Sequence, residues 1–281
     1  MREGRIAPIG RLSLAPVEKI HAMVPILRPM VVFVLAWVRA MGDTRRMTQP
    51  LRLHYAPDNA SLVIRLALEE MGVAYETVLV DRSVDAHRGA AYRRLHPGGV
   101  IPALETPQGI VFETAAILLW LADTYGMMAP APDAPERGAF LKWLFFASNT
   151  LHADLRMLFY PEQYIGESEE DQAALRAGLI PRLRQHLGIL DAATADGTAG
   201  FSVETPSVLG YYLACQLRWM ALYPDGYDPG WFRLSDYPAL AKMLTGLENR
   251  PATRAAQHAE GLGPNPFTAP VHPNPPEGSA I

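Results

Sequence analysis

The order in which two hydrophobic patterns follow each other along the chain most restricts its fold. Residues 51–125 alternate between short strand-like and helix-like runs, whereas residues 136–249 carry helix-like runs alone. Apolar residues at every second position are typical of a half-buried strand, and a spacing of three or four is typical of a helix. We therefore expect an α/β domain followed by an all-α domain.

The first half predicts a small mixed sheet. The run LRLHY at 51–55 alternates and breaks at the turn sequence APDN, after which residues 61–71 have helical spacing. The later elements expected are a strand within 74–81, a short helix within 87–95, a hairpin within 101–112 and a helix over 114–125. The expected order is βαβ followed by ββα.

The second half predicts helices only. Residues 127–135 (MMAPAPDAP) have the composition of a linker, and the helical segments beyond them are 136–158, 169–193, 207–222 and 238–249. Pro181 should kink the second helix, and Ser207 should cap the third, which is nearly all apolar and should be buried. We assign residues 47–127 to the α/β domain and 134–262 to the all-helical domain, with a ligand-binding seam between them.

Both ends lie outside these domains. Residues 1–46 carry eight Lys or Arg against three acids, and their apolar run at 30–38 has nine residues, where a membrane span needs about 20. Three interpretations stay open: a non-native extension upstream of a true start at Met47, a membrane-surface or targeting segment, or an extra helix packed on the body. Residues 263–281 hold six prolines and predict an extended, mobile tail.

Composition excludes several classes of protein. With 49% hydrophobic residues and a net charge of −4, the chain is too apolar to be disordered as a whole and too acidic for a protein built around nucleic acid. Its single cysteine, Cys215, excludes an intrachain disulfide and a cysteine-cluster metal site. Because it stands in an apolar run, we expect it to be buried. A cytoplasmic protein without a metal or a membrane partner is expected.

Several short motifs, in order along the chain, resemble the cytosolic glutathione transferase family. They are LHYAP at 53–57, HPGGVIPAL at 96–104, FETAAI at 112–117, PSVLGYYL at 206–213, DYPAL at 236–240 and NRPA at 249–252. The resemblance covers residues 47–262 and implies a thioredoxin-like first domain, in which Pro102 corresponds to the cis-proline. It also implies a homodimer that uses glutathione as co-substrate.

Such a protein must stabilise a thiolate, because the thiol of glutathione is a poor nucleophile. The N-terminus of the helix at 61–71 would favour negative sulfur through its unpaired N–H groups and dipole. Lowering a thiol pKa from about 8.5 to about 6.5 requires roughly 2.7 kcal/mol, so a further donor must assist. The resemblance implies that Glu113 and Thr114 bind the γ-glutamyl end, although Thr114 could simply cap its helix. It implies that Ile101, through its backbone, and Pro102 bind the cysteinyl moiety.

The chain resembles bacterial beta-class members at residues 55–62, but it differs from them in the group that would donate to the thiolate. Those proteins carry a catalytic cysteine where Ala60 stands here. The remaining candidates are Ser61, Asn59 and Tyr55. Each has a structural alternative, since Ser61 could cap its helix, Asn59 could serve the turn and Tyr55 could pack on its strand.

The helical half offers further candidates. His152 corresponds to a beta-class active-site histidine, but Ala153 replaces the lysine beside it. His152 could donate a hydrogen bond to the thiol or the substrate, and could equally be a solvated or packed residue. His87 and Arg88 lie in the loop that supplies relatives with a cation for the glycyl carboxylate, and could equally be solvated. Side chains expected to contact a hydrophobic electrophile are Phe145, Leu155, Met157, Phe159 and Tyr160.

These residues favour a glutathione transferase that adds the glutathione thiolate to a hydrophobic electrophile. Because the cysteine is replaced by Ala60, the alternative is a non-catalytic protein of the same fold that binds a ligand or a protein partner.

Overall fold

The computed structural model describes residues 50–280, except 199, 203 and 225–228. The interpretations of residues 1–46 therefore lie outside the described residues. Within the described part of the chain, no helix combines the length and apolarity needed to cross a membrane. Residues 49–281 group as one compact unit, so the boundary proposed between the two domains stays a prediction.

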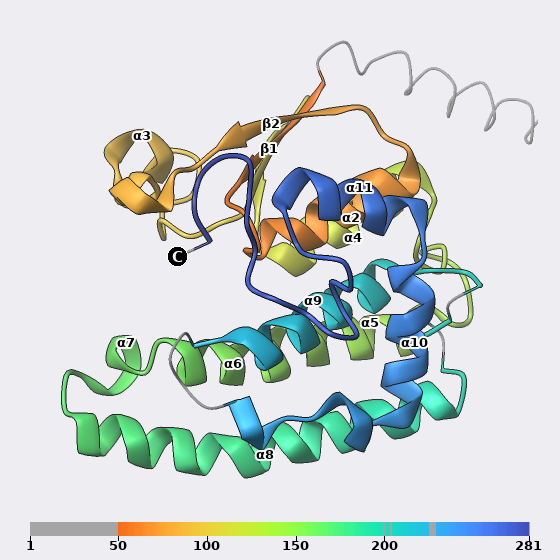
Figure 1. Ribbon diagram of the computed structural model, residues 1–281. Coiled ribbons are helices and arrows are strands. Elements are labelled where there is room, and N and C mark those ends of the chain that lie inside the picture. Colours follow the sequence, from red (N-terminus) through yellow and green to blue (C-terminus); the bar gives the residue numbers. More distant parts are fainter. Residues whose placement is uncertain (1–49, 199, 203, 225–228, 281) are drawn as a thin grey trace, which may run out of the picture. The chain divides into compact units, whose positions relative to one another are not determined.

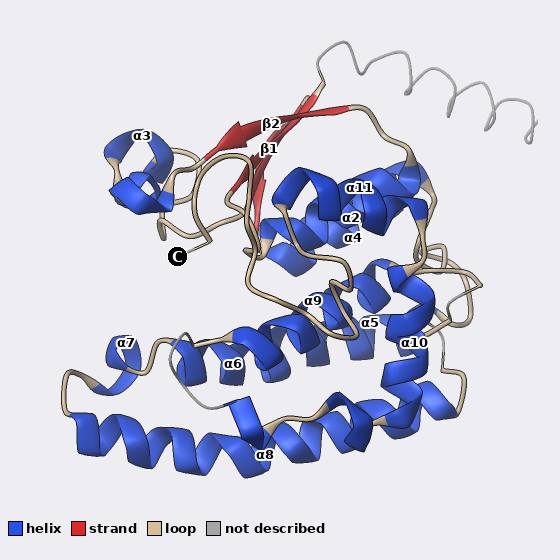
Figure 2. Ribbon diagram, viewed as in Figure 1, coloured by secondary structure: helices blue, strands red, loops and turns tan. Residues whose placement is uncertain are grey.

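A four-stranded mixed sheet forms the centre of the first half (Figure 2). The elements in order are β1 (Leu51–Tyr55), α2 (Ser61–Met71), β2 (Tyr75–Leu79), the 3₁₀ turns Arg82–Val84 and Ala86–Arg88, α3 (Ala90–Arg93), β3 (Ala103–Thr106), β4 (Gly109–Phe112) and α4 (Thr114–Tyr125). The strand order is β2-β1-β3-β4, with β1 parallel to β2 and antiparallel to β3. The predicted order βαβ-ββα is confirmed, and the peptide bond before Pro102 is cis as expected.

Helix α2 is the most buried element of this half. Nine of its 11 residues are buried, because the sequence SLVIRLALEEM is apolar on nearly every face and each face needs a partner. It packs on β1 and α4 from its own half and on α9 and α11 from the second half (Figure 1). The helix ends at Gly72, whose φ of 64° lets its N–H reach back to the last turn. Thus α2 belongs to the cores of both halves.

The second half is helical, as predicted. Its elements are α5 (Arg137–Phe146), a π-helical segment (Ala147–Leu151), α6 (His152–Phe159), α7 (Glu162–Ile165), α8 (Glu169–Ala195), α9 (Val208–Leu222), the 3₁₀ turns Pro229–Trp231 and Leu234–Asp236, α10 (Pro238–Glu248) and α11 (Pro251–Glu260). The helix expected over 136–158 is therefore interrupted by the π-helical segment. Helix α11 was not foreseen as a separate element, because Pro251 suggested an end, whereas a proline is also well placed at a first helical position.

Helix α9 forms the buried centre of the second half, as predicted. All its residues from Val208 to Met220 are buried, including Cys215, and burial raises the pKa of that thiol well above its usual value. Ser207 caps the helix, since its Oγ accepts a hydrogen bond from the Gly210 N–H at 3.0 Å. Cys215 therefore serves packing.

Charged groups join α2 to the second half. The Glu70 carboxylate accepts hydrogen bonds from Arg250 Nε at 2.8 Å and from the Tyr211 hydroxyl at 2.7 Å. Arg65 Nε donates to the fully buried Glu260 at 2.7 Å. Breaking such a buried pair by removing one partner is strongly destabilising, so these contacts fix the two halves together.

The segment 263–281 corrects a prediction: its described residues pack on the body instead of forming a mobile tail outside the fold. Phe267 is 1% exposed, and the Glu248 carboxylate accepts hydrogen bonds from the N–H groups of Phe267 at 2.8 Å and Thr268 at 2.9 Å. Figure 1 shows the dark blue segment passing from α11 back toward the sheet. The prolines removed backbone donors as expected, but body side chains supply the segment with partners.

Candidate functional site

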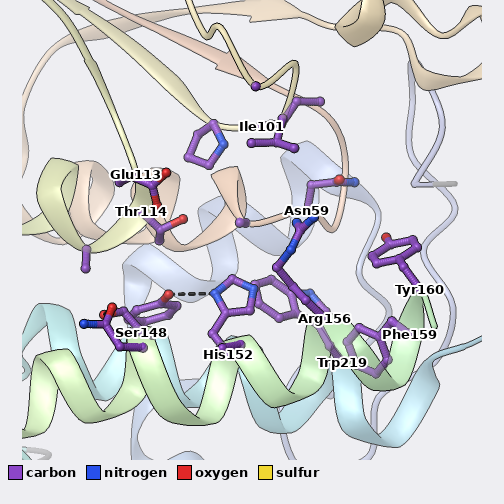
Figure 3. A pocket seen from close by; sticks show the side chains of 18 of the residues that line it. Asn59, Ile101, Glu113, Thr114, Ser148, His152, Arg156, Phe159, Tyr160 and Trp219 are labelled. Atoms are coloured by element: carbon purple, nitrogen blue, oxygen red, sulfur yellow. Dashed lines mark hydrogen bonds between the residues drawn. The ribbon is translucent and has the colours of Figure 1, made fainter. Parts of the chain in front are cut away.

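A cavity of about 930 Å³ lies between the sheet half and the helical half (Figure 3). Its upper side is formed by the loop before α2, by Ile101 and Pro102 before β3, and by the first residues of α4. Its lower side is formed by α5, the π-helical segment, α6 and the end of α9. Small-molecule sites have volumes of about 300–1,000 Å³, so the cavity is large enough for a ligand of several groups.

The start of α4 brings Glu113 and Thr114 to the cavity, together with the predicted Ile101 and Pro102. Glu113 has φ 71° and ψ 118°, a conformation that is uncommon for a residue with a Cβ and costs about 1–3 kcal/mol. It occupies the position before the helix, and neither it nor Thr114 caps the helix with its side chain. Among the described residues Glu113 has no ion-pair partner. A carboxylate and unpaired helix N–H groups thus meet at one end of the cavity.

The start of α2 contributes Asp58, Asn59 and Ala60 to the lining. Ala60 stands at the position before the helix, where it offers only backbone. Asn59 is half-buried, and its side-chain amide donates to the carbonyl oxygens of Pro57 at 2.9 Å and Ala280 at 3.1 Å. Asn59 Oδ1 accepts from Arg82 Nη1 at 3.0 Å. All the hydrogen-bonding groups of this amide are therefore engaged.

The two hydroxyl candidates do not line the cavity. Ser61 is fully buried, and its Oγ donates to the Ala56 carbonyl at 3.0 Å instead of capping α2, so the expected cap is wrong. The Tyr55 hydroxyl donates to the Glu277 carboxylate at 2.5 Å. Burial and Glu277 raise the pKa of Tyr55, so it remains a phenol. Both hydroxyls are therefore occupied by structural contacts, which sequence alone could not show.

A buried network holds the turn before α2. The Asp58 carboxylate accepts hydrogen bonds from Arg218 Nε at 2.8 Å and Nη2 at 2.9 Å, from Trp219 Nε1 at 3.1 Å and from the Tyr223 hydroxyl at 2.9 Å. Asp58 itself has φ 52°, a left-handed conformation that aspartate tolerates. The network sets the position of Asn59 and Ala60 relative to α9.

His152 is the first residue of α6 and points into the cavity from below (Figure 3). Its Nδ1 lies 2.7 Å from the Tyr212 hydroxyl, and its ring lies 5.7 Å from the Trp219 ring. Burial, aided by Arg156, lowers the pKa of His152 to about 4, so the ring is neutral at pH 7. We assign the Tyr212 hydroxyl as the donor to Nδ1, because it has no other acceptor among the described residues. This leaves the proton on Nε2, as a donor toward a ligand.

Two arginines that were not foreseen also line the cavity. Arg82 Nη1 donates to Asn59 Oδ1 at 3.0 Å and to the Ala280 carbonyl at 2.8 Å, whereas Arg156 Nε donates to the Tyr164 hydroxyl at 3.3 Å. Neither forms an ion pair with an acid within the described residues. His87 and Arg88, named from the sequence, do not line the cavity. The spacing of Arg156 four residues after His152, on one helix face, was the available signal.

Aromatic side chains form most of the remaining lower wall. Phe145, Phe159 and Tyr160 line it as predicted, and Trp219 and Tyr223 join them from the end of α9. Leu155, which is fully buried, and Met157 do not line it, because helical periodicity turns them away. Within the described residues, no cluster of His, Cys, Asp or Glu side chains could hold a metal ion.

The fold and the cavity define a class of protein in which a thioredoxin-like domain is joined to an all-helical domain at a ligand site. The family model for the glutathione S-transferase N-terminal domain matches residues 60–124. Glutathione S-transferase GST-4.5 of Xanthomonas campestris pv. campestris is 27% identical over 220 residues, which cover 75% of this chain and 100% of that protein.

Two solved structures extend the match over the whole fold. The bacterial beta-class glutathione S-transferase of Sphingomonas chungbukensis is 32% identical with a TM-score of 0.61, covering 75% of this chain and 98% of that one. A sphingomonad glutathione S-transferase complexed with glutathione is also 32% identical with a TM-score of 0.61, covering 75% of this chain and 100% of that one. The chain belongs to the glutathione S-transferase family.

Proposed function

We propose that this protein binds glutathione in the cavity and adds its thiolate to a hydrophobic electrophile. The observation that carries the proposal is the convergence of Ile101, Pro102, Glu113, Thr114 and the start of α2 on one side of the cavity, opposite an aromatic wall. The sphingomonad relative, whose structure is a complex with glutathione, supports this choice of ligand. A cytoplasmic homodimer, as is typical of the family, is part of the proposal.

The charges along the cavity suit an extended glutathione molecule. The Glu113 carboxylate would pair with the γ-glutamyl ammonium, and the free N–H groups at the start of α4, with Thr114, would bind the adjacent carboxylate. The backbone of Ile101 would pair with the cysteinyl moiety. Arg82 would face the glycyl carboxylate, because it is the lining cation next to the start of α2. The sulfur would then lie near Ala60.

The thiolate would be stabilised from two sides. Above it, the N-terminus of α2 supplies free N–H groups and its dipole. Below it, His152 Nε2–H and the Arg156 guanidinium rise from α6 into the cavity (Figure 3). A hydrogen bond to a charged group contributes about 1.5–3 kcal/mol, so one such donor and the dipole together reach the roughly 2.7 kcal/mol required. The thiol proton leaves to water, and a sulfur electron pair then forms the C–S bond. With an aryl halide, the carbon–halogen bond breaks and the halide ion leaves with its electron pair.

The test is binding of glutathione, followed by conjugation of an electrophilic aryl halide. Glu113→Gln should weaken glutathione binding by about tenfold or more, since a charge-assisted contact is lost, whereas the exposed Glu162→Gln is the matched control. Arg156→Met should raise the pKa of the bound thiol, because a positive charge near the sulfur is lost. This pKa is measured from the absorbance of the thiolate as the pH is changed. Failure of the unmodified protein to bind glutathione would refute the proposal.

A non-catalytic binding protein is the second candidate. It is favoured by one observation, that the start of α2 offers no side-chain thiol or free hydroxyl, because Ala60 replaces the cysteine and Ser61 is turned toward Ala56. Binding of glutathione without conjugation of any aryl halide tested would favour this candidate.

A further inference from the structure

Residues 277–280 reach the edge of the cavity from the far part of the chain. Ala280 lines the cavity, and its carbonyl oxygen accepts hydrogen bonds from Asn59 Nδ2 at 3.1 Å and Arg82 Nη1 at 2.8 Å. The Glu277 carboxylate accepts a hydrogen bond from the Tyr55 hydroxyl at 2.5 Å. Gly278 has φ 71° and packs so closely on β2 that a Cβ would lie 2.6 Å from Leu79 Cδ1. Three independent contacts thus hold four consecutive residues.

The same segment is anchored upstream. Arg218, which is fully buried, donates to the carbonyl oxygens of Pro266 at 3.0 Å and Val271 at 3.0 Å, and Asn274 N–H donates to the Gly261 carbonyl at 2.9 Å. The cavity of about 930 Å³ stays open with the segment in place. A peptide that occupied the place of the ligand would fill this space and would need only weak anchors to leave it. The segment has the opposite properties: it leaves the cavity open and is held by strong anchors, as a fixed wall would be.

We propose that residues 277–280 are a built-in wall of the ligand site, which, together with Asn59, positions Arg82 to receive the carboxylate at one end of the ligand. The proposal rests on the proposed function, because the ligand tested is glutathione. It assigns Asn59, Tyr55 and Glu277 a positioning role, in place of the thiolate contact considered for Asn59 and Tyr55.

The geometry of Arg82 explains how the wall would act. Both N–H groups of Nη1 are occupied, one by Asn59 Oδ1 and one by the Ala280 carbonyl. This fixes the plane of the guanidinium and leaves Nε and Nη2 without a hydrogen-bond partner in the described part of the chain. These two nitrogens form the edge that binds a carboxylate with two parallel hydrogen bonds. Without Ala280, Arg82 keeps only Asn59 as a partner, and the ligand must order both side chains when it binds.

Tyr55 and Glu277 would hold the wall against the first strand. Tyr55 is 2% exposed and lies under the Arg65 guanidinium, whose carbon is 4.7 Å from the ring centre. Because its pKa is raised, the phenol keeps its proton and remains a donor to Glu277. Arg65 is itself fixed by Glu260. The wall is therefore connected to the buried charges of the fold.

The experiment shortens the chain to end at Pro276. This change removes the contacts of residues 277–280 but retains those of Phe267, Pro266 and Val271 with the body. Calorimetric titration with glutathione should show affinity reduced roughly three- to tenfold, the range expected from ordering one or two side chains. The urea midpoint should change little. A chain ending at Gly278, which keeps Glu277, should show most of the loss if Ala280 is the main contact.

Two comparisons separate positioning of Arg82 from a general structural effect. Glutathione esterified on its glycyl carboxylate should lose no affinity when the chain is shortened. In a double-mutant cycle, Arg82→Met should remove most of the effect of shortening, because both changes act on one contact. Gly278→Val should loosen the segment without a deletion and so reproduce the shortened chain, because valine is strained at φ 71° and its Cβ would lie 2.6 Å from Leu79 Cδ1.

The outcomes are distinguishable. If the full chain does not bind glutathione, both this proposal and the proposed function are overturned. If it binds and the shortened chain binds equally well, the wall alone is overturned. Tighter binding by the shortened chain would also overturn it, since the segment would then be a competitor of the ligand. An equal loss for glutathione and its glycyl ester would show that Arg82 is not what the segment positions.

Discussion

Replacement of Asp58 by asparagine, a side chain of nearly the same size, should greatly lower the free energy of unfolding. The Asp58 carboxylate is fully buried and accepts four hydrogen bonds, two of them from Arg218, whose side chain is also fully buried. Asparagine keeps the size of the side chain and tolerates the left-handed backbone at φ 52°. The substitution Asp58→Asn therefore removes the charge and replaces one carboxylate oxygen, which accepts two hydrogen bonds, by an amide nitrogen that can only donate.

The magnitude follows from the charge that is left behind. Arg218 would remain in the interior without a counter-charge, with one amide oxygen of the new side chain and the carbonyl oxygens of Leu262, Pro266 and Val271 as partners. Removing one partner of a buried ion pair costs about 3–5 kcal/mol, against a total unfolding free energy of about 5–15 kcal/mol for a typical domain. We expect a loss of about 3–5 kcal/mol for Asp58→Asn.

Urea unfolding followed by tryptophan fluorescence measures this loss, because Trp219 donates to Asp58. Arg218→Met and the double variant complete a thermodynamic cycle, in which a coupling free energy of about 2 kcal/mol or more is expected. Ser83→Ala, on the exposed turn after β2, is the control variant and should leave the unfolding free energy nearly unchanged. A loss below about 1 kcal/mol for Asp58→Asn would refute the reasoning, because the pair would then be solvated or dispensable.

Three further predictions concern stability. The pKa of His152 is lowered from 6.5 to about 4, so the unfolded chain binds a proton first as the pH falls. Up to about 3 kcal/mol of unfolding free energy should therefore be lost between pH 6.5 and 4. His152→Gln should abolish this part of the pH dependence, as measured by urea unfolding at several pH values. Glu113→Gly should raise the unfolding free energy by about 1 kcal/mol, because glycine adopts φ 71° without strain, while weakening glutathione binding; equal or lower stability in urea would contradict it. Ser207→Ala should cost about 1 kcal/mol through loss of the α9 cap, with Ser207→Thr losing less in the same assay.

The regular elements could be predicted because their information is local. Alternation at 51–55 and helical spacing at 61–71 reflect which faces are buried, and both elements lie where the pattern placed them. The cap at Ser207 is also local, since it needs only the adjacent turn. The interruption between α5 and α6 was missed, because a single π-helical turn inside an α-helix is rare and the apolar pattern of the segment reads as one continuous helix.

The side chains of the site could be predicted only in part. Ile101, Pro102, Glu113, Thr114 and His152 line the cavity, since each stands at an element end that the topology turns toward it. Ser61 and Tyr55 do not, because their hydroxyls find partners at Ala56 and Glu277 that depend on tertiary packing. The role of residues 277–280 was invisible for the same reason: the contact with Tyr55 joins residues 222 apart.

These long separations have a consequence for synthesis of the protein. Asp58, Arg65 and Tyr55 find their partners 160, 195 and 222 residues further along the chain. A growing chain can pair β1 with β2 early, yet the turn before α2 keeps an uncompensated carboxylate until Arg218 has been made. The cavity gains Ala280 only when nearly the whole sequence has been translated. Nascent chains interrupted before this point would expose α2 to the chaperones and proteases that recognise unfolded proteins.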